Sequence, residues 1–318
     1  MNPQTKFYEL RNRLPGKVVK FIFFANYFIG ILAIGLSLES VVQLQLPFNS
    51  GVYYMLLFCG TVVYYTYAYT STGNYTISGN PRTQWYRDHR VFIRRSQIVL
   101  TCVCLGSGIS IAINHYENIL NLPLPYWFIM IIIALSVLLY YGLLPQSSVK
   151  LNLRNTGWIK AFVIGFVWAC CVNLLPLVML KIERGHFMAE PLLVVWLFVK
   201  NWMFCTVNAI MFDMKDYADD ANRQLKTFAV RIGLRKTIFY VLIPLLAIGV
   251  ISFTVFAWLR NFGVITFLIN LIPFICLLIV AYSLQRRKSI LFYLIVIDGL
   301  LLLKALCGIM GMHFLLSR

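Results

Sequence analysis

The residues of this chain best suited to chemistry are three aspartates in one short stretch, Asp213, Asp216 and Asp220. In a continuous helix, at about 100° per residue, they fall within an arc of roughly 60°, whereas Asp219 points away from it. Like charges on one helix face repel each other, by about 0.2–0.5 kcal/mol per pair, so their grouping favours a bound cation. Oxygen ligands without Cys or His indicate Mg²⁺ or Ca²⁺. Mg²⁺ with a diphosphate is the expected ligand, because Mg²⁺ combines a few carboxylates with substrate phosphates.

The elements that must position these aspartates are membrane-spanning helices. Hydrophobic residues make up 60% of the 318, charged residues only 12%, and the mean hydropathy is +0.77, whereas a soluble domain is about 25% charged. Apolar stretches long enough to cross a bilayer occur at 18–38, 51–70, 96–114, 125–144, 158–180, 191–212, 237–258, 262–283 and 289–314. They lack the alternation of barrel strands. We therefore predict an all-α integral membrane protein, a bundle of nine transmembrane helices forming a single domain over residues 1–318.

The distribution of positive charge predicts the orientation of the bundle. Counted over alternate loops, 22 of the 28 Lys and Arg residues lie on one side of the membrane and four on the other. The positive-inside rule then places the N-terminus in the cytoplasm and the C-terminus outside. The same pattern accounts for the net charge of +17 without nucleic acid, because the basic residues are dispersed next to the spans.

The stretch that contains the aspartates resembles a known family motif. The spacing Asp213-x-x-Asp216-x-x-x-Asp220 is followed by Thr227-Phe-Ala-Val-Arg-Ile-Gly233. This is similar to the second aspartate-rich motif of the UbiA superfamily of intramembrane prenyltransferases, in which DxxDxxxD leads into a Thr-Leu-Pro-Val-x-x-Gly run. Nine spans with a cytoplasmic N-terminus also match that superfamily.

Two other loops carry weaker parts of the resemblance. Tyr140-Tyr141-Gly, with Lys150 and Arg154 downstream, is similar to the family's Tyr-Ser…Leu-Lys-Arg stretch. The family's first motif, an Asn followed by aspartates at four-residue spacing after the second span, is degenerate. The corresponding loop offers Asn74 or Asn80, and its only acid is Asp88.

The resemblance implies a Mg²⁺-dependent prenyltransferase that moves an isoprenoid chain from a prenyl diphosphate to a lipid-soluble acceptor through an allylic carbocation. It implies Asp213, Asp216 and Asp220 as the metal ligands. The expected diphosphate-binding residues are Asn74, Asn80, Lys150, Arg154 and Arg223. Membrane lipid is the surrounding partner, and a bacterial inner membrane is the expected location.

Two alternative functions stay open, one suggested by charges inside the spans and the other by the degenerate first motif. Lys200 and Asp298 fall at similar depth and can pair, while Lys304 lies deeper, toward the outer face. Such residues are costly in lipid and often functional, which favours a transporter. The degenerate first motif favours a catalytically silent relative that binds an isoprenoid lipid or a partner protein.

Overall fold

The computed structural model describes residues 16–70, 81–141, 157–185, 190–222, 225–286 and 288–316, which contain helices and no strand. The chain is divided into two compact units. Unit 1 comprises Met1–Ile34 and Ser50–Asn114, and unit 2 comprises Gly35–Asn49 and His115–Arg318.

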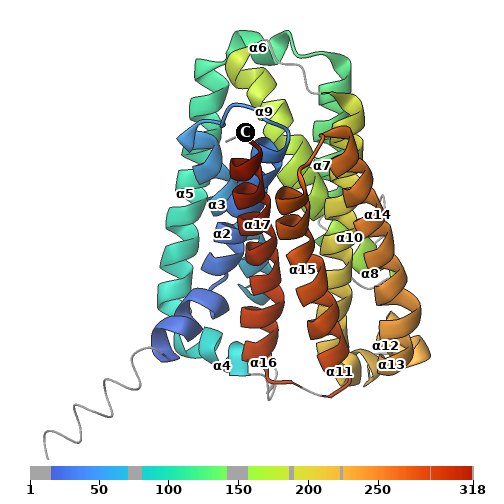
Figure 1. Cartoon of the computed structure of the whole chain (residues 1–318). Coiled ribbons are helices and arrows are strands. Elements are labelled where there is room, and N and C mark those ends of the chain that lie inside the picture. The colour runs from blue at the N-terminus through green and yellow to red at the C-terminus, as the bar shows by residue number, and fades with distance from the viewer. Residues whose placement is uncertain are drawn as a thin grey trace, which may run out of the picture. The chain divides into compact units, whose positions relative to one another are not determined.

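Unit 1 is built from helices around the first two apolar stretches. Its helices are Gly16–Phe24, the first part of α2 (Tyr27–Gln43), α3 (Gly51–Thr70), α4 (Pro81–Asp88) and α5 (Arg90–Asn114). The helix Gly16–Phe24 meets α2 at an angle of 65°, and Asn26 at this break has a left-handed φ of 65°. Asn tolerates that conformation better than most residues because its side chain hydrogen-bonds locally. Helices α3 and α5 pack against each other (Figure 1).

Unit 2 contains the second part of α2 and the remaining helices. These are α6 (Tyr116–Leu120), α7 (Leu124–Tyr141), α8 (Ile159–Ala169), α9 (Leu175–Arg184), α10 (Pro191–Lys215), α11 (Tyr217–Asn222), α12 (Phe228–Ile232), α13 (Leu234–Thr237), α14 (Ile243–Leu259), α15 (Val264–Ser283), α16 (Ile290–Phe292) and α17 (Asp298–Leu316). Single π-helical turns join α8 to α9, α13 to α14 and α16 to α17. The first two precede Pro176 and Pro244 in the next helix, and proline, which lacks an N–H, disrupts the regular hydrogen-bond ladder before it.

Six helices of the described chain are long and apolar enough to cross a membrane, namely Arg90–Asn114, Ile159–Arg184, Pro191–Lys215, Leu234–Leu259, Val264–Ser283 and Ile290–His313. The bent pair Gly16–Phe24 and Tyr27–Gln43 makes a seventh if it counts as one span. The apolar helix Leu124–Leu138 is shorter, and α3 is rich in Tyr and Thr, which lowers its hydropathy. The chain is thus a multi-pass, all-helical membrane protein, and the nine-span topology and its orientation stay predictions.

Helix α10 is the central element of unit 2. It packs against α8 on one side and α14 on another, and α15 packs against α17 (Figure 1). The approach of α8 to α10 depends on Gly165, because a Cβ there would lie 2.2 Å from Thr206 Oγ1 and 2.7 Å from the Thr206 backbone nitrogen. Small residues at such crossings let membrane helices approach closely.

The two ends of unit 2 differ in what they carry. Helices α11, α12 and α13 lie at one end, near α16, and α6 lies at the opposite end, toward which α17 runs (Figure 1). The aspartate motif therefore sits at the end where α10 finishes.

Candidate functional site

The aspartate stretch is interrupted where the sequence predicts one helix face. Helix α10 ends at Lys215, Asp216 caps it with φ −89° and ψ 9°, and α11 begins at Tyr217. Backbone bonds still link the turn, since Asp216 N donates to Asp213 O at 3.1 Å and Asp220 N to Asp216 O at 2.8 Å. The expectation of a single continuous helix through all three aspartates is therefore wrong. The tightened turn, an i→i+3 bond at Asp216, rotates the later residues relative to the earlier ones.

Asp213 is buried and ion-paired. Its side chain is 6% exposed, and Lys160 Nζ donates to its Oδ1 at 2.7 Å. Lys160 lies in the first turn of α8, 17% exposed, so α8 supplies the counter-charge for the last turn of α10. A buried carboxylate is costly unless it has such a partner, which makes Lys160 part of the site although its sequence context suggests only a topological charge.

Asp216 has a more open environment. Its side chain is 39% exposed and pairs with the neighbouring Lys215 at 3.2 Å. Asp216 and Asp213 are close enough for their negative charges to repel each other. Aromatic rings stand next to them, because Phe212 and Tyr293 lie 6.2 Å apart between ring centroids and Tyr293 is within electrostatic range of Asp216. Asp220, on α11, is 6% exposed.

The run after the aspartates forms a compact corner. Thr227 is buried, has an extended backbone and precedes α12. Gly233 ends α12 with a φ of 84°, a conformation that glycine adopts without strain. The Thr and Gly of the motif thus occupy the two positions where this corner changes direction.

The residues of the site suit a cation that takes some of its ligands from the substrate better than a cation held by protein ligands alone. In the part of the chain that the structure describes, no three Asp, Glu, His or Cys side chains are grouped closely enough to hold a metal ion. The pair Asp213 and Asp216 nevertheless supplies the one or two carboxylates that Mg²⁺ uses when phosphates and water complete its shell. Mg²⁺ bound in this way would depend on a diphosphate for its remaining ligands.

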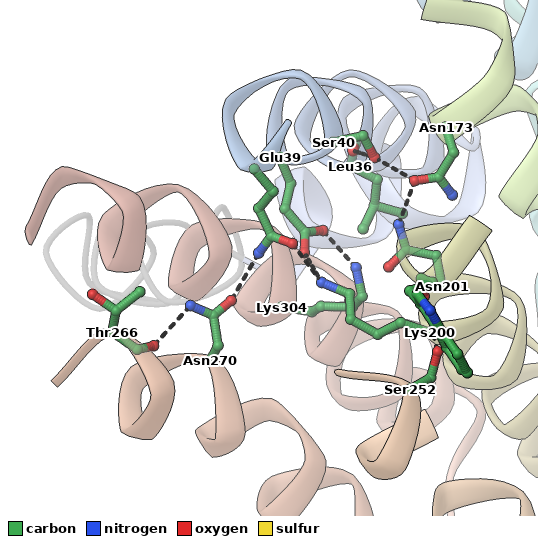
Figure 2. A network of polar contacts seen from close by, with 12 residues as sticks. Leu36, Glu39, Ser40, Asn173, Lys200, Asn201, Ser252, Thr266, Asn270 and Lys304 are labelled. Atoms are coloured by element: carbon green, nitrogen blue, oxygen red, sulfur yellow. Dashed lines mark hydrogen bonds and ion pairs between the residues drawn. The ribbon is translucent and has the colours of Figure 1, made fainter. Parts of the chain in front are cut away.

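A second polar site lies inside unit 2, away from the aspartate motif. Glu39 Oε1 accepts from Lys200 at 3.1 Å and Oε2 from Lys304 at 2.5 Å, and all three side chains are at most 3% exposed (Figure 2). Gly308 makes room for this carboxylate, since a Cβ there would lie 2.4 Å from Glu39 Cγ. Lys200 therefore does not form the pair with Asp298 that similar depth in the membrane suggests.

Amide and hydroxyl groups extend this network. Gln43 accepts from Lys200 at 2.7 Å and donates to Asn270 at 2.8 Å. Ser40, in the same turn of α2 as Glu39, donates to Asn173, which also accepts from Asn201 (Figure 2). The network ties α2, α10, α15 and α17 together. In the sequence, only the two intramembrane lysines point to this network. Glu39 was missed because the expected first span ends one residue before it.

The other residues predicted for the site lie outside the described residues or in unit 1. Asn74, Asn80, Lys150, Arg154 and Arg223 lie outside the described residues, so their roles stay predictions.

In unit 1, Asp88 is exposed at the end of α4. Arg82 is buried and donates to Phe24 O at 2.9 Å and to Asn26 Oδ1 at 2.5 Å. Arg82 therefore fixes the break before α2 in place.

The fold and the acidic site define a multi-pass helical membrane protein with paired carboxylates at one end of helix α10. Comparison with family models assigns residues 91–291 to the UbiA prenyltransferase family. This match covers more than half of the chain, including the aspartate motif, and the chain belongs to that family. No curated protein and no solved structure matches the chain. The matched segment begins after the loop that holds Asn74 and Asn80.

Proposed function

We propose that this protein is an integral-membrane prenyltransferase that moves an isoprenoid chain from a prenyl diphosphate to a lipid-soluble acceptor, which we expect to be aromatic. The observation that carries the proposal is the juxtaposition of Asp213 and Asp216 at the end of α10, within the segment that matches the family. Carboxylates at this position suit a cation that is itself held by a diphosphate.

The aspartates bind and orient the donor through this cation. Asp213, from the buried last turn of α10, and Asp216, at its more exposed cap, would hold the cation, and Asp220 of α11 is proposed as the third ligand. Bound Mg²⁺ would neutralise charge on the departing diphosphate and so ease cleavage of the allylic C–O bond. Lys150, Arg154, Arg223, Asn74 and Asn80 remain the proposed diphosphate contacts.

Aromatic residues beside the acids suit a cationic intermediate. Phe212 precedes Asp213 in α10, and Tyr293, 3% exposed, packs on it. A ring face attracts a cation by about 0.5–2 kcal/mol, more when water is excluded. The isoprenoid tail would lie among apolar helix surfaces and reach the acceptor without crossing water.

Donor binding is the experiment that tests this proposal. The full-length protein in detergent is titrated with prenyl diphosphates of several lengths, with Mg²⁺ or with EDTA, while its thermal unfolding is followed. A donor at 100-fold its Kd stabilises the folded state by about 2.7 kcal/mol. We expect that stabilisation only with Mg²⁺, and we expect Asp216→Asn to abolish it.

A matched control keeps the result specific. Glu117→Gln changes an exposed acid in α6, at the opposite end of unit 2, and should leave donor stabilisation unchanged. A folded wild-type protein that shows no shift with any donor contradicts the proposal.

That outcome would favour a silent relative that binds an isoprenoid lipid or a partner protein. Two observations support this second function. Asp213 is already neutralised by Lys160, and the described residues contain no preformed group of three metal ligands. Binding of neutral isoprenoids without Mg²⁺ dependence would identify it.

A further inference from the structure

Lys160 stands where a cation would approach Asp213. Its Nζ lies 2.7 Å from Asp213 Oδ1, and both side chains are shielded from water. A metal ion that takes this oxygen as a ligand therefore competes with the ammonium group for it. The displaced group would remain at the same end of unit 2, because Lys160 is anchored in the first turn of α8.

The start of α8 packs against the segment between α11 and α12. Gly157, with φ +70°, lies so close to this segment that a Cβ on Gly157 would be 2.6 Å from Lys226 O. The rings of Trp158 and Phe228 follow at 5.9 Å between centroids. The segment before Lys160 is thus packed on the segment that follows the aspartates.

A matched control for Lys160 lies on α13. Lys236 is exposed in the last turn of that helix, at the same end of unit 2. Replacing it removes the same charge as replacing Lys160, but from a side chain in water, where a charge contributes little.

We propose that Lys160 is an exchangeable counter-ion. It neutralises Asp213 in the empty protein, and it moves its ammonium group to a diphosphate oxygen of the donor when a divalent cation binds Asp213. This inference rests on the proposed function, because it requires a prenyl diphosphate at the site.

The charges favour the exchange. A fully ionised prenyl diphosphate carries three negative charges and Asp213 carries a fourth, whereas one divalent cation brings only two positive charges. The ammonium group of Lys160 lowers this excess from two negative charges to one, and a lysine ammonium is a good point-charge ligand for phosphate. The loop after the second span has a single acid, Asp88, and so offers few carboxylates for a second metal ion. The ammonium group of Lys160 supplies positive charge in place of a second metal ion.

The exchange predicts opposite effects on the two ligands. Lys160→Gln removes the competitor for Asp213, so the empty protein should bind a divalent cation about 3- to 10-fold more tightly. The same variant loses a charged contact to the donor, whose affinity at saturating metal should fall by about 10- to 100-fold. A residue that only supports the structure would weaken both.

The experiment uses the full-length protein in detergent. Binding of Mn²⁺ alone is followed by electron paramagnetic resonance, and binding of farnesyl diphosphate at saturating Mn²⁺ by calorimetry. The variants are Lys160→Gln, Lys160→Arg and the control Lys236→Gln. We expect Lys160→Gln to bind Mn²⁺ more tightly and the donor more weakly, and Lys160→Arg to recover donor binding. Lys236→Gln should change either affinity by less than 2-fold.

Other outcomes overturn the exchange. Parallel loss of both ligands in Lys160→Gln, with Lys160→Arg behaving in the same way, means that Lys160 is structural. An unchanged Mn²⁺ affinity in Lys160→Gln means that Lys160 does not compete with the cation for Asp213. This result overturns the exchange even if the wild type binds the donor well. A wild-type protein that binds Mn²⁺ but no donor overturns the proposed function and the transfer to diphosphate together, whatever the Mn²⁺ affinity of the variants.

Discussion

Replacing Glu39 by glutamine removes the carboxylate that two buried lysines share. Lys200 and Lys304 lie 3.1 and 2.5 Å from its oxygens. At an effective dielectric constant of about 20, each attraction amounts to roughly 5–7 kcal/mol before desolvation is counted. Removing one partner of a buried ion pair has a net cost of about 3–5 kcal/mol, because the remaining charge stays buried. Glu39→Gln leaves two ammonium groups beside a neutral amide, so we expect a loss at the upper end of that range.

Replacing one lysine should be milder. Lys304→Met leaves Glu39 paired with Lys200, which also donates to Gln43 at 2.7 Å, and we expect a loss of about 1–2 kcal/mol. Adding Lys304→Met to Glu39→Gln removes one of two like charges. The double variant should therefore regain about 1–2 kcal/mol relative to Glu39→Gln alone.

Unfolding by sodium dodecyl sulfate in mixed micelles, followed by circular dichroism, measures these differences. Ser252→Ala is the control, because it removes one buried hydrogen bond, to Trp196 O at 2.9 Å, without changing any charge, and should cost about 1 kcal/mol. The reasoning fails if Glu39→Gln lies within 1 kcal/mol of the wild type. It also fails if Lys304→Met destabilises the Glu39→Gln background further.

Two more predictions concern helix packing and pH. Gly165→Ala should destabilise the protein by about 2 kcal/mol or more, because its Cβ would lie 2.2 Å from Thr206 Oγ1. Gly106→Ala is the control and should not destabilise the protein in the same unfolding assay, because a Cβ at Gly106 meets nothing within 4 Å. Equal losses of stability in the two variants would refute the role of the close helix approach. In unit 1, burial raises the pKa of the Tyr86 phenol above its ordinary value of 10.0, partly offset by Arg82. The neutral phenol thus stabilises the fold fully below about pH 10, and this contribution is lost as the pH rises through the raised value. Tyr86→Phe should lose less stability than the wild type as the pH rises above about 10, and an unchanged pH slope would contradict this.

The helical architecture could be predicted because it depends on local composition. Apolar runs in lipid must satisfy their backbone groups within the segment, and the described part of each expected run is mainly helical. The bend after Phe24 was harder to predict. It depends on Asn26 in a left-handed conformation and on Arg82, 56 residues away, which donates to Asn26.

The acidic motif could be predicted from its spacing, but its geometry could not. Neither Gly nor Pro marks the break at Asp216, so the helix pattern runs through it. Lys160 and Glu39 escaped prediction because their partners are distant in sequence, by 53 residues for Lys160 and Asp213 and by 265 for Lys304 and Glu39. Pairing of this kind is decided by which helices pack together, and one sequence does not specify that.

Photolabelling with a prenyl diphosphate tests the central claim most directly, because it locates the donor without knowledge of the acceptor. A donor analogue with a photoreactive group near its diphosphate is bound to the full-length protein with Mg²⁺ or EDTA, cross-linked, and mapped by mass spectrometry. We predict Mg²⁺-dependent labelling of peptides from the end of α10, the corner around α12 and the start of α8, competed by unlabelled donor and lost in Asp216→Asn. Labelling that ignores Mg²⁺, or that maps to the α6 end of unit 2, would contradict the assignment of this protein as a prenyltransferase acting at Asp213 and Asp216.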